Sequence, residues 1–310
     1  MNSSCERELA SYLLVGTNEK FSLVILFLCI TNTFSAIVST IGNFLVVTAI
    51  WRTRSLHCPS FVLLSGLALS DLAVGLISQP IFVASNITLL FEDCALFSIL
   101  VRVHEYFANQ LLAVSFFTLS VASLDRFLAF KLHLRYQELI TVRRIVLCLS
   151  FIWITASIFA LWISFHRTSA EIAKIVFVLG FSLSTVICYF KIFRVVSYHQ
   201  RSIESQTQTT GRDTQESRPR LARYKRSVRS LLYIVGVFCV SYLPWVFWVI
   251  AKYSISKGET VEIVLAARVL FTVSYSNACF NPFLYCWRMQ DIREAIKQQT
   301  RVLCKKRARS

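Results

Sequence analysis

Seven long apolar runs, separated by short polar segments, set the pattern of this chain. A helix needs about 20 apolar residues to cross a bilayer, and more when it is tilted. The runs that reach this length cover residues 22–51, 59–85, 95–128, 145–165, 172–197, 228–251 and 261–286. Charged residues within segment 165–171 predict a turn between the fourth run and the fifth. The pattern therefore predicts an all-α bundle of seven transmembrane helices.

Polar segments flank and interrupt this bundle. Residues 1–21 form a polar N-terminal tail, and residues 22–287 form the membrane domain, with a flexible polar loop at about 199–223. Residues 288–310 are rich in basic side chains, and four apolar positions recur among them at helical spacing: Met289, Ile292, Ala295 and Ile296. This spacing predicts a short amphipathic helix on the inner leaflet, with a soluble tail as the alternative.

The distribution of charge predicts the orientation of the chain. The formal net charge is +16, and 55% of the residues are hydrophobic. When the N-terminus is placed outside, most Lys and Arg residues fall in the cytoplasmic segments, as the positive-inside rule requires. The tail 1–21 is then extracellular and residues 288–310 are cytoplasmic. Attraction to anionic membrane lipids accounts for the positive charge, so no nucleic-acid partner is expected.

Three positions are candidates for covalent modification. Asn2 and Asn86 each begin a glycosylation sequon, and both fall on the predicted outer side. Cys304 lies beside Lys305-Lys306-Arg307 after the last span, which makes it a candidate for S-palmitoylation. Most of the remaining cysteines lie within spans, where a thiol behaves as a small apolar residue.

Polar residues inside the spans are costly and therefore indicate function. At 1.5 Å per residue, Asp71 lies about 18 Å into the second span, and Ser115 lies about 16 Å from Arg126 in the third, at a similar depth. Asn277 and Asn281 in the seventh run can join them. These oxygens suit a small hard cation, and an interhelical hydrogen-bond network is the equal alternative.

Charged residues at both ends of the third span mark two further sites. Glu105 and Arg126 are separated by about 31 Å, which is close to the hydrocarbon thickness of a bilayer. The Asp125-Arg126 pair should therefore lie at the inner mouth of the bundle. Pro244 and Pro282 each remove a backbone hydrogen bond from a span, which predicts kinks in the sixth and seventh helices.

Taken together, these residues resemble the class A, rhodopsin-like G-protein-coupled receptors over about residues 35–304. The motifs that carry the resemblance are Gly42-Asn43, Leu67-Ala68-Leu69-Ser70-Asp71, Asp125-Arg126-Phe127, Leu134-Arg135-Tyr136, Trp153, Tyr189, Phe238 with Pro244, and Asn281-Pro282 with Tyr285. Each motif alone is weak, but their order on the expected helices is highly specific. The resemblance implies a plasma-membrane receptor that transduces an extracellular ligand to a heterotrimeric G protein.

The resemblance also implies roles for individual residues. The coupling and activation residues would be Asp125, Arg126, Tyr189, Asn281, Pro282 and Tyr285. The core switch would be Phe238, Tyr242 and Pro244. The sodium-binding residues would be Asp71, Ser115, Asn277 and Asn281, and no other cofactor is implied. Arg126 would contact the C-terminal helix of the Gα subunit, and Asp125 would restrain Arg126 at rest.

Departures from the usual pattern indicate a branch of this family. Val101 stands where the disulfide cysteine of the third helix is expected, and segment 165–171 contains no cysteine. Phe181 replaces the usual proline of the fifth helix, and Tyr242 replaces the usual Trp of the sixth. The short, cysteine-free loop and the proline-free fifth helix resemble the melanocortin, adenosine, cannabinoid and lysophospholipid receptors.

The resemblance further implies where a ligand binds. The expected pocket wall comprises Glu105, Asn109, Leu112, Trp245, Trp248, Val249, Phe271 and Tyr275, an aromatic and apolar set with few convergent polar groups. Ala108 occupies the position of the amine-binding Asp, and Tyr275 occupies that of the retinal lysine, so a biogenic amine and retinal are not expected. Glu105 can alternatively pair with Arg102, three residues before it.

Two other classes of protein are weighed against a receptor. A small multi-pass transporter or channel is the main alternative, but transporters tend to carry broken helices in both halves, whereas the prolines here lie mainly in the last two spans. An enzyme is not expected, because the sequence shows no metal-binding His/Asp cluster and no nucleophile with a base.

Overall fold

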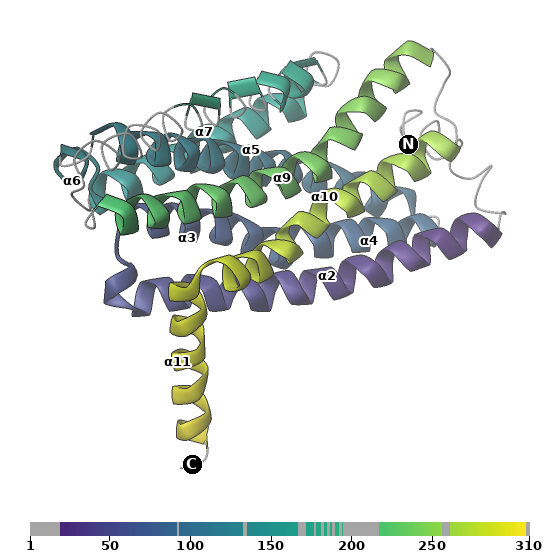
Figure 1. Ribbon diagram of the computed structural model, residues 1–310. Helices are drawn as coiled ribbons and strands as arrows, with labels where there is room; N and C mark the ends of the chain where they lie inside the picture. The colour runs from purple at the N-terminus through teal and green to yellow at the C-terminus, as the bar shows by residue number, and fades with distance from the viewer. Residues whose placement is uncertain are drawn as a thin grey trace.

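The computed structural model is a bundle of long helices (Figure 1). It describes residues 19–91, 93–132, 135–166, 172–176, 178–180, 183–184, 187, 190–191, 194, 217–255 and 261–307. The long helices are α2 (Glu19–Arg52), α3 (Pro59–Ala73), α4 (Gln79–Leu90), α5 (Cys94–Leu132), α7 (Val142–Phe165), α9 (Ser217–Ile255), α10 (Val261–Arg288) and α11 (Gln290–Arg307). Short elements are η1 (Arg54–Leu56), η2 (Val74–Ser78) and α6 (Tyr136–Leu139).

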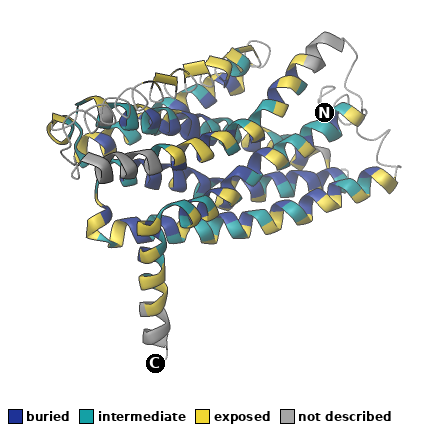
Figure 2. Ribbon diagram, in the orientation of Figure 1, coloured by how far each residue is buried: buried dark blue, intermediate teal, exposed yellow. Residues whose placement is uncertain are grey.

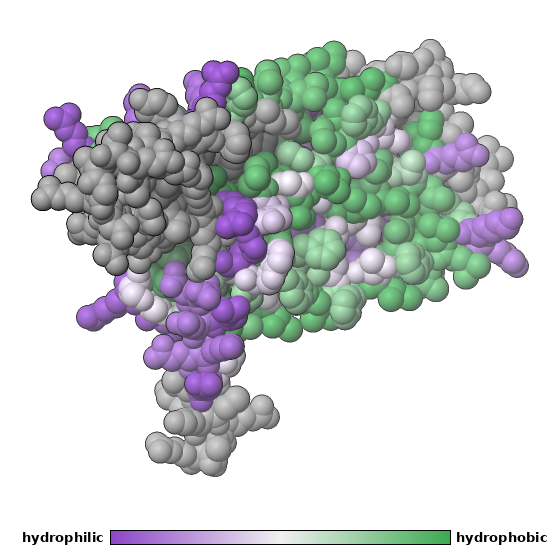
Figure 3. Space-filling model, viewed as in Figure 1, coloured by the Kyte–Doolittle hydropathy of each residue, from purple (hydrophilic) through white to green (hydrophobic). Residues whose placement is uncertain are grey.

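Six of the seven predicted spans stand within the described residues as helices long and apolar enough to cross a membrane. They are α2, the continuous stretch from α3 to α4, α5, α7, α9 and α10. The remaining run, 172–197, is described only in part, and its described positions are helical. On the face seen in Figure 3, hydrophobic side chains cover much of the surface between the two ends of the bundle, as contact with lipid requires.

Helix α5 lies at the centre of the bundle and contacts α3, α4, α7 and α9. Helix α2 packs against α3, α4 and α10, which closes the other side. Buried residues are concentrated on the parts of the helices that lie inside the bundle, and exposed residues on its outside (Figure 2). We call the end where α5 and α10 begin the pocket end, and the end where α10 meets α11 the α11 end.

A π-helical turn, η2, interrupts the second span just after Asp71. Pro80 follows it and has no backbone N–H, so the helix cannot keep a regular hydrogen-bond ladder there. Gly75 lies within the turn, and a Cβ on it would come within 2.7 Å of Thr40 Oγ1 and 2.9 Å of the Ala36 carbonyl oxygen. The turn and the glycine together let α2 approach the second span closely.

The predicted proline kink of α10 is stabilised by α2. Pro282 provides no N–H for the carbonyl of Ala278 four residues earlier, and Asn43 Nδ2 donates to that carbonyl at 3.0 Å. Gly42 makes room for the proline, because a Cβ at this position would lie 2.8 Å from Pro282 Cγ. The Gly42-Asn43 motif thus fits the proline of the seventh span.

The amphipathic helix predicted after the last span is confirmed as α11. Ile292 and Ala295 are buried, and Met289 and Ile296 pack against the same hydrophobic core. Its other side is exposed and hydrophilic, and the helix turns away from the axis of the bundle and extends past α2 (Figures 1 and 3). Gln299 Nε2 also donates to a hydroxyl on α2 at 2.9 Å.

Candidate functional site

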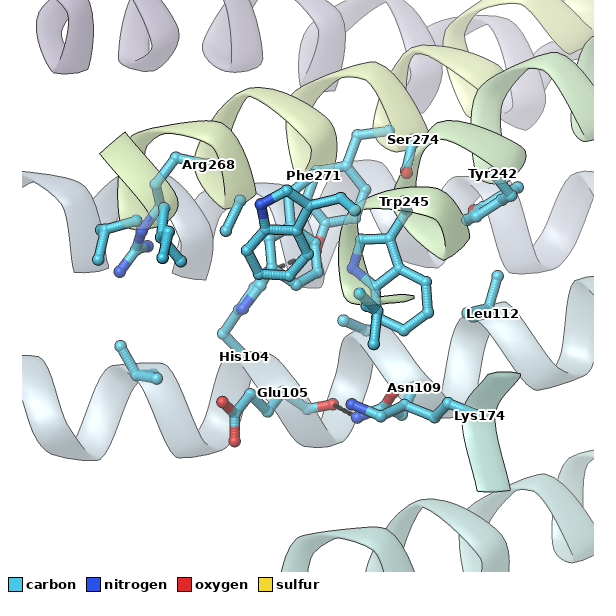
Figure 4. Close-up of a pocket in the computed structure, with 18 residues that line it drawn as sticks. His104, Glu105, Asn109, Leu112, Lys174, Tyr242, Trp245, Arg268, Phe271 and Ser274 are labelled. Carbon is cyan, nitrogen blue, oxygen red and sulfur yellow. Dashed lines mark hydrogen bonds between the residues drawn. The ribbon is translucent and has the colours of Figure 1, made fainter. Parts of the chain in front are cut away.

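A cavity of about 260 Å³ opens between α5, α9 and α10 at the pocket end. All eight residues predicted for the ligand wall line it (Figure 4): Glu105, Asn109, Leu112, Trp245, Trp248, Val249, Phe271 and Tyr275. The α5 residues lie three or four positions apart and therefore share one face of that helix. The predicted composition of the wall is only partly right, because His104, Lys174 and Arg268 also line the cavity.

A hydrogen-bonded chain of polar side chains joins three helices beside this cavity. The Tyr275 hydroxyl lies 2.5 Å from His104 Nε2 and 2.9 Å from Ser78 Oγ. The His104 ring also packs against Phe82 at 5.0 Å and Phe271 at 5.2 Å between centroids. Ser78 is the last residue of η2, so the π turn positions it toward α10. The contacts fix the rings of α5 and α10 against α4.

Arg268 is a buried cation on α10, with 8% of its surface exposed. Its Nη1 donates to Ser85 Oγ at 3.1 Å, and its guanidinium carbon lies 5.5 and 5.6 Å from the ring centroids of Phe82 and Phe97. Lys174 lies at the opposite side of the cavity, with its Nζ 5.5 Å from the Trp245 ring centroid. Ionisable groups therefore make up more of the cavity than the sequence indicated.

A second, smaller cavity of about 20 Å³ lies deeper in the bundle and is lined by Asp71, Ser115 and Asn277. Asn281 Nδ2 donates to Asp71 Oδ2 at 2.7 Å, which brings the fourth predicted residue to the same place. Among the described residues, Asn277 Oδ1 and Asn281 Oδ1 are buried without a hydrogen-bond partner. The structure thus gathers all four predicted residues at one depth.

The two cavities share a wall. Five residues line both of them: Ala108, Leu112, Tyr242, Ser274 and Tyr275. Below this wall the Tyr242 ring lies 4.5 Å from that of Phe238 and 5.6 Å from that of Phe116. Phe116 and Phe238 are in turn 4.6 Å apart and perpendicular. These three rings form an aromatic cluster between α5 and α9, within the two helical turns that precede Pro244.

At the α11 end, Asp125 accepts from three donors. Arg126 forms an ion pair with its Oδ2, the Ser60 hydroxyl donates to Oδ2 at 3.1 Å, and the Tyr136 hydroxyl donates to Oδ1 at 2.5 Å. The Asp125 side chain is 2% exposed and that of Arg126 is 14% exposed. The structure thus pairs Asp125 with Arg126, and a restraining role for this pair in the resting state stays a prediction.

The family model described as "7 transmembrane receptor (rhodopsin family)" matches residues 42–174 and 169–285. The chain belongs to this family. It is a rhodopsin-like G-protein-coupled receptor, which transduces ligand binding to a G protein, and the family is one of multi-pass membrane receptors rather than enzymes. The match spans the partly described fifth helix, and it favours a receptor over a small transporter or channel.

Two kinds of receptor are among the curated relatives. The receptor is 26% identical over 281 residues to the adenosine receptor A3 of Bos taurus, covering 82% of this chain and 83% of the relative. It is also 26% identical over 291 residues to the trace amine-associated receptor 7c of Rattus norvegicus, covering 85% and 79%. Because both kinds match about equally, the comparisons show the family and leave the ligand open.

The remaining predicted residues of the receptor lie either outside the described part of the chain or away from the two cavities. Tyr189, Asn2 and the side chain of Cys304 fall outside what the structure describes. Tyr285 is fully buried in the hydrophobic core near the α11 end. Asn86 is also fully buried, within α4, so the predicted glycosylation there is wrong: a glycan needs a side chain that reaches solvent.

Sequence reasoning missed several residues of the receptor's cavities and aromatic cluster, among them His104, Phe116, Lys174 and Arg268. His104 and Phe116 follow the helical spacing of the predicted α5 residues, so periodicity could have found them. Arg268 is a lone cation in an apolar run, which is itself a signal of function. Lys174 is placed by the packing of its helix, which the sequence pattern does not provide.

Proposed function

We propose that the receptor binds a small ligand in the 260 Å³ cavity and transmits binding through Tyr242 to Arg126, where a G protein engages. The observation that carries this proposal is the shared wall: Tyr242 lines the ligand cavity, lines the Asp71 cavity and packs on Phe238 and Phe116. A ligand that moves Tyr242 therefore disturbs all three at once, and the kink at Pro244 gives α9 a place to bend.

Charge supports an orientation with the N-terminus outside and the α11 end in the cytoplasm of the plasma membrane. Described basic residues cluster near the α11 end: Arg52, Arg54, Lys131, Arg135, Arg143 and Arg144. Hydrophilic side chains also gather there in Figure 3, on α11 and beside it. This asymmetry is what the positive-inside rule describes for cytoplasmic segments. Arg126 then faces the compartment that contains G proteins.

The Asp71 cavity fits a sodium ion. It offers a carboxylate, the Ser115 hydroxyl and two amide oxygens without a partner among the described residues, which is the oxygen set that a hard cation prefers. Its volume of about 20 Å³ exceeds the roughly 10–15 Å³ that one small occupant such as a water needs. Asp71, Ser115, Asn277 and Asn281 would hold the ion, which would neutralise the buried carboxylate.

The experiment that tests this function is nucleotide exchange on purified Gα, with Arg126→Ala compared with Arg52→Ala. Both residues are arginines near the α11 end, but Arg52 is exposed at the end of α2. We expect Arg126→Ala to reach the cell surface and lose exchange, while Arg52→Ala retains both. Full exchange by Arg126→Ala at equal surface expression would contradict the assignment.

A further inference from the structure

The residues that line the cavity also indicate the chemical class of its ligand, if the cavity is the ligand site as proposed above. We infer that the ligand is a small organic acid with a flat aromatic body. Its carboxylate would bind the Arg268 guanidinium, and its ring would lie between Phe271, Trp245 and Trp248. The inference rests on the position of Arg268, on the balance of charge around the cavity, and on the size and lining of the cavity.

Arg268 is held in place before any ligand arrives. Its guanidinium donates to Ser85 on α4 and lies over the rings of Phe82 and Phe97, so its position is fixed from several sides. A guanidinium carries five N–H donors in a rigid fork that matches the two oxygens of a carboxylate. A preorganised fork loses little conformational entropy when it binds an acid.

The charges that line the cavity favour an anion. Arg268 and Lys174 are cations, and Glu105 is the acidic residue among the lining side chains. A buried charge inside an apolar bundle is costly, and an opposite charge from the ligand offsets that cost in a medium of low dielectric constant. A cationic ligand would instead meet two like charges. The cavity therefore selects against an amine.

The size and walls of the cavity define the rest of the ligand. A volume of about 260 Å³ lies below the roughly 300–1,000 Å³ typical of ligand pockets, so one fused ring system with a short side chain fits. In Figure 4, Arg268 lies at one end and Lys174 with Asn109 at the other, while Phe271 and Trp245 lie between them. Aromatic side chains favour stacking or edge contacts with a flat ring.

The acid is assigned to Arg268 rather than to Lys174. Arg268 is 8% exposed, whereas Lys174 is only partly buried and lies against the face of Trp245. A less solvated cation gains more from an anion, because less water has to be displaced and screening is weaker. Lys174 is close enough to the aromatic wall to contact the far edge of the ligand body.

Three indoles of nearly equal size test this inference: indole-3-acetate, indole-3-acetamide and tryptamine. Each is added to the full receptor in lipid nanodiscs, and its apparent Kd is obtained from the shift in thermal unfolding against concentration. We expect indole-3-acetate to bind more tightly than the amide and the amine. A hydrogen bond to a charged group contributes about 1.5–3 kcal/mol, so Arg268→Gln should weaken the acid by about 10- to 150-fold. The amide should change far less.

Two further variants test whether Arg268 or Lys174 binds the acid. Lys174→Gln should retain most of the preference for the acid, and Arg268→Lys should weaken it because the fork is lost. Tighter binding of the amide or the amine by wild type, or no binding by any of the three, overturns the inference. Loss of the preference in Lys174→Gln but not in Arg268→Gln overturns the assignment to Arg268. If Arg268→Gln does not fold, the relative affinities of the three indoles for wild type still test whether the ligand is an acid.

The pocket-filling variant Leu112→Trp distinguishes failure of this inference from failure of the proposed function. If tryptamine or the amide binds best and Leu112→Trp blocks it, the cavity is the ligand site and only the acid is wrong. If the best probe still binds Leu112→Trp with unchanged affinity, the cavity itself is not the site. Nucleotide exchange retained by Arg126→Ala would refute the proposed role of Arg126 in G-protein coupling, whichever probe binds the cavity.

Discussion

Replacing Tyr136 by phenylalanine should raise the basal rate of nucleotide exchange. Tyr136 lies on α6, outside the membrane spans, and its hydroxyl donates to Asp125 Oδ1 at 2.5 Å. The substitution keeps the ring and removes only that donor. Asp125 then accepts from one donor fewer, and we expect the Tyr136 contact to be present at rest and lost when Arg126 is released. The resting state should therefore become less stable relative to the active state.

The structure sets the size of this effect. A hydrogen bond to a charged group contributes about 1.5–3 kcal/mol, and the half-buried position of Tyr136 favours the lower figure. Asp125 still accepts from Ser60 and Arg126, so the carboxylate is not left without partners. A shift of about 1.4 kcal/mol is tenfold in an equilibrium constant, so the active fraction should rise up to about tenfold while it remains the minor state.

The assay is ligand-free nucleotide exchange on Gα by the purified receptor in nanodiscs. Ser60→Ala is the matched control for the loss of one donor, and its effect should be smaller because the Ser60 bond is longer, at 3.1 Å. Basal exchange by Tyr136→Phe equal to that of wild type, at equal receptor concentration, would refute the view that Asp125 restrains Arg126 through this contact. A decrease would refute it as well.

The pH dependence gives a second check on the same contact. Burial and the hydrogen bond to Asp125 raise the pKa of the Tyr136 hydroxyl above its usual 10.0. A raised pKa means that the folded receptor favours the protonated tyrosine, so the contact is fully present below about pH 10 and is lost as the pH rises through the raised pKa. The difference between wild type and Tyr136→Phe should therefore be constant across neutral pH.

Three further outcomes are expected. Sodium at constant ionic strength, with choline as the control, should raise the thermal stability of wild type and of Asp125→Asn but not that of Asp71→Asn, because an ion that binds only the folded receptor stabilises it. An unchanged sodium response in Asp71→Asn would show that the four residues form only a structural hydrogen-bond network. Glycosidase treatment should shift the electrophoretic mobility of wild type and Asn86→Gln alike, and a glycan lost in Asn86→Gln but not in Asn2→Gln would contradict the buried position of Asn86. Ile292→Ala should lower the free energy of unfolding by about 2–5 kcal/mol, whereas an equally stable variant would show that α11 does not pack on the core.

Helical periodicity made much of this receptor predictable from its sequence. Once six of the spans are set by their apolar runs, the face of each helix follows from the 3.6-residue repeat. Glu105, Asn109 and Leu112 therefore had to share one side of α5. The depth of a residue follows from the rise per residue, which is why Asp71 and Ser115 could be placed at one level.

The missed features depend on contacts between helices. The pattern of the second span gave no direct sign of η2, so the rotation of α4 and the burial of Asn86 could not be derived. Lys174 and Arg268 reach the cavity only because their helices are turned toward it by packing. The partner of a buried side chain depends on tertiary structure, which a single-span periodicity does not contain.

The π turn η2 also has a consequence for how this receptor can change over evolutionary time. Each π turn holds one residue more than the α-helix around it, so loss or gain of a single residue between 74 and 78 would rotate all of α4 by about 100° and leave α3 untouched. Ser78 would lose its hydrogen bond to Tyr275, and Phe82 and Ser85 would turn away from His104 and Arg268. One codon inserted or deleted here would therefore remove, in one step, the α4 side chains that hold His104 and Arg268 in place beside the cavity.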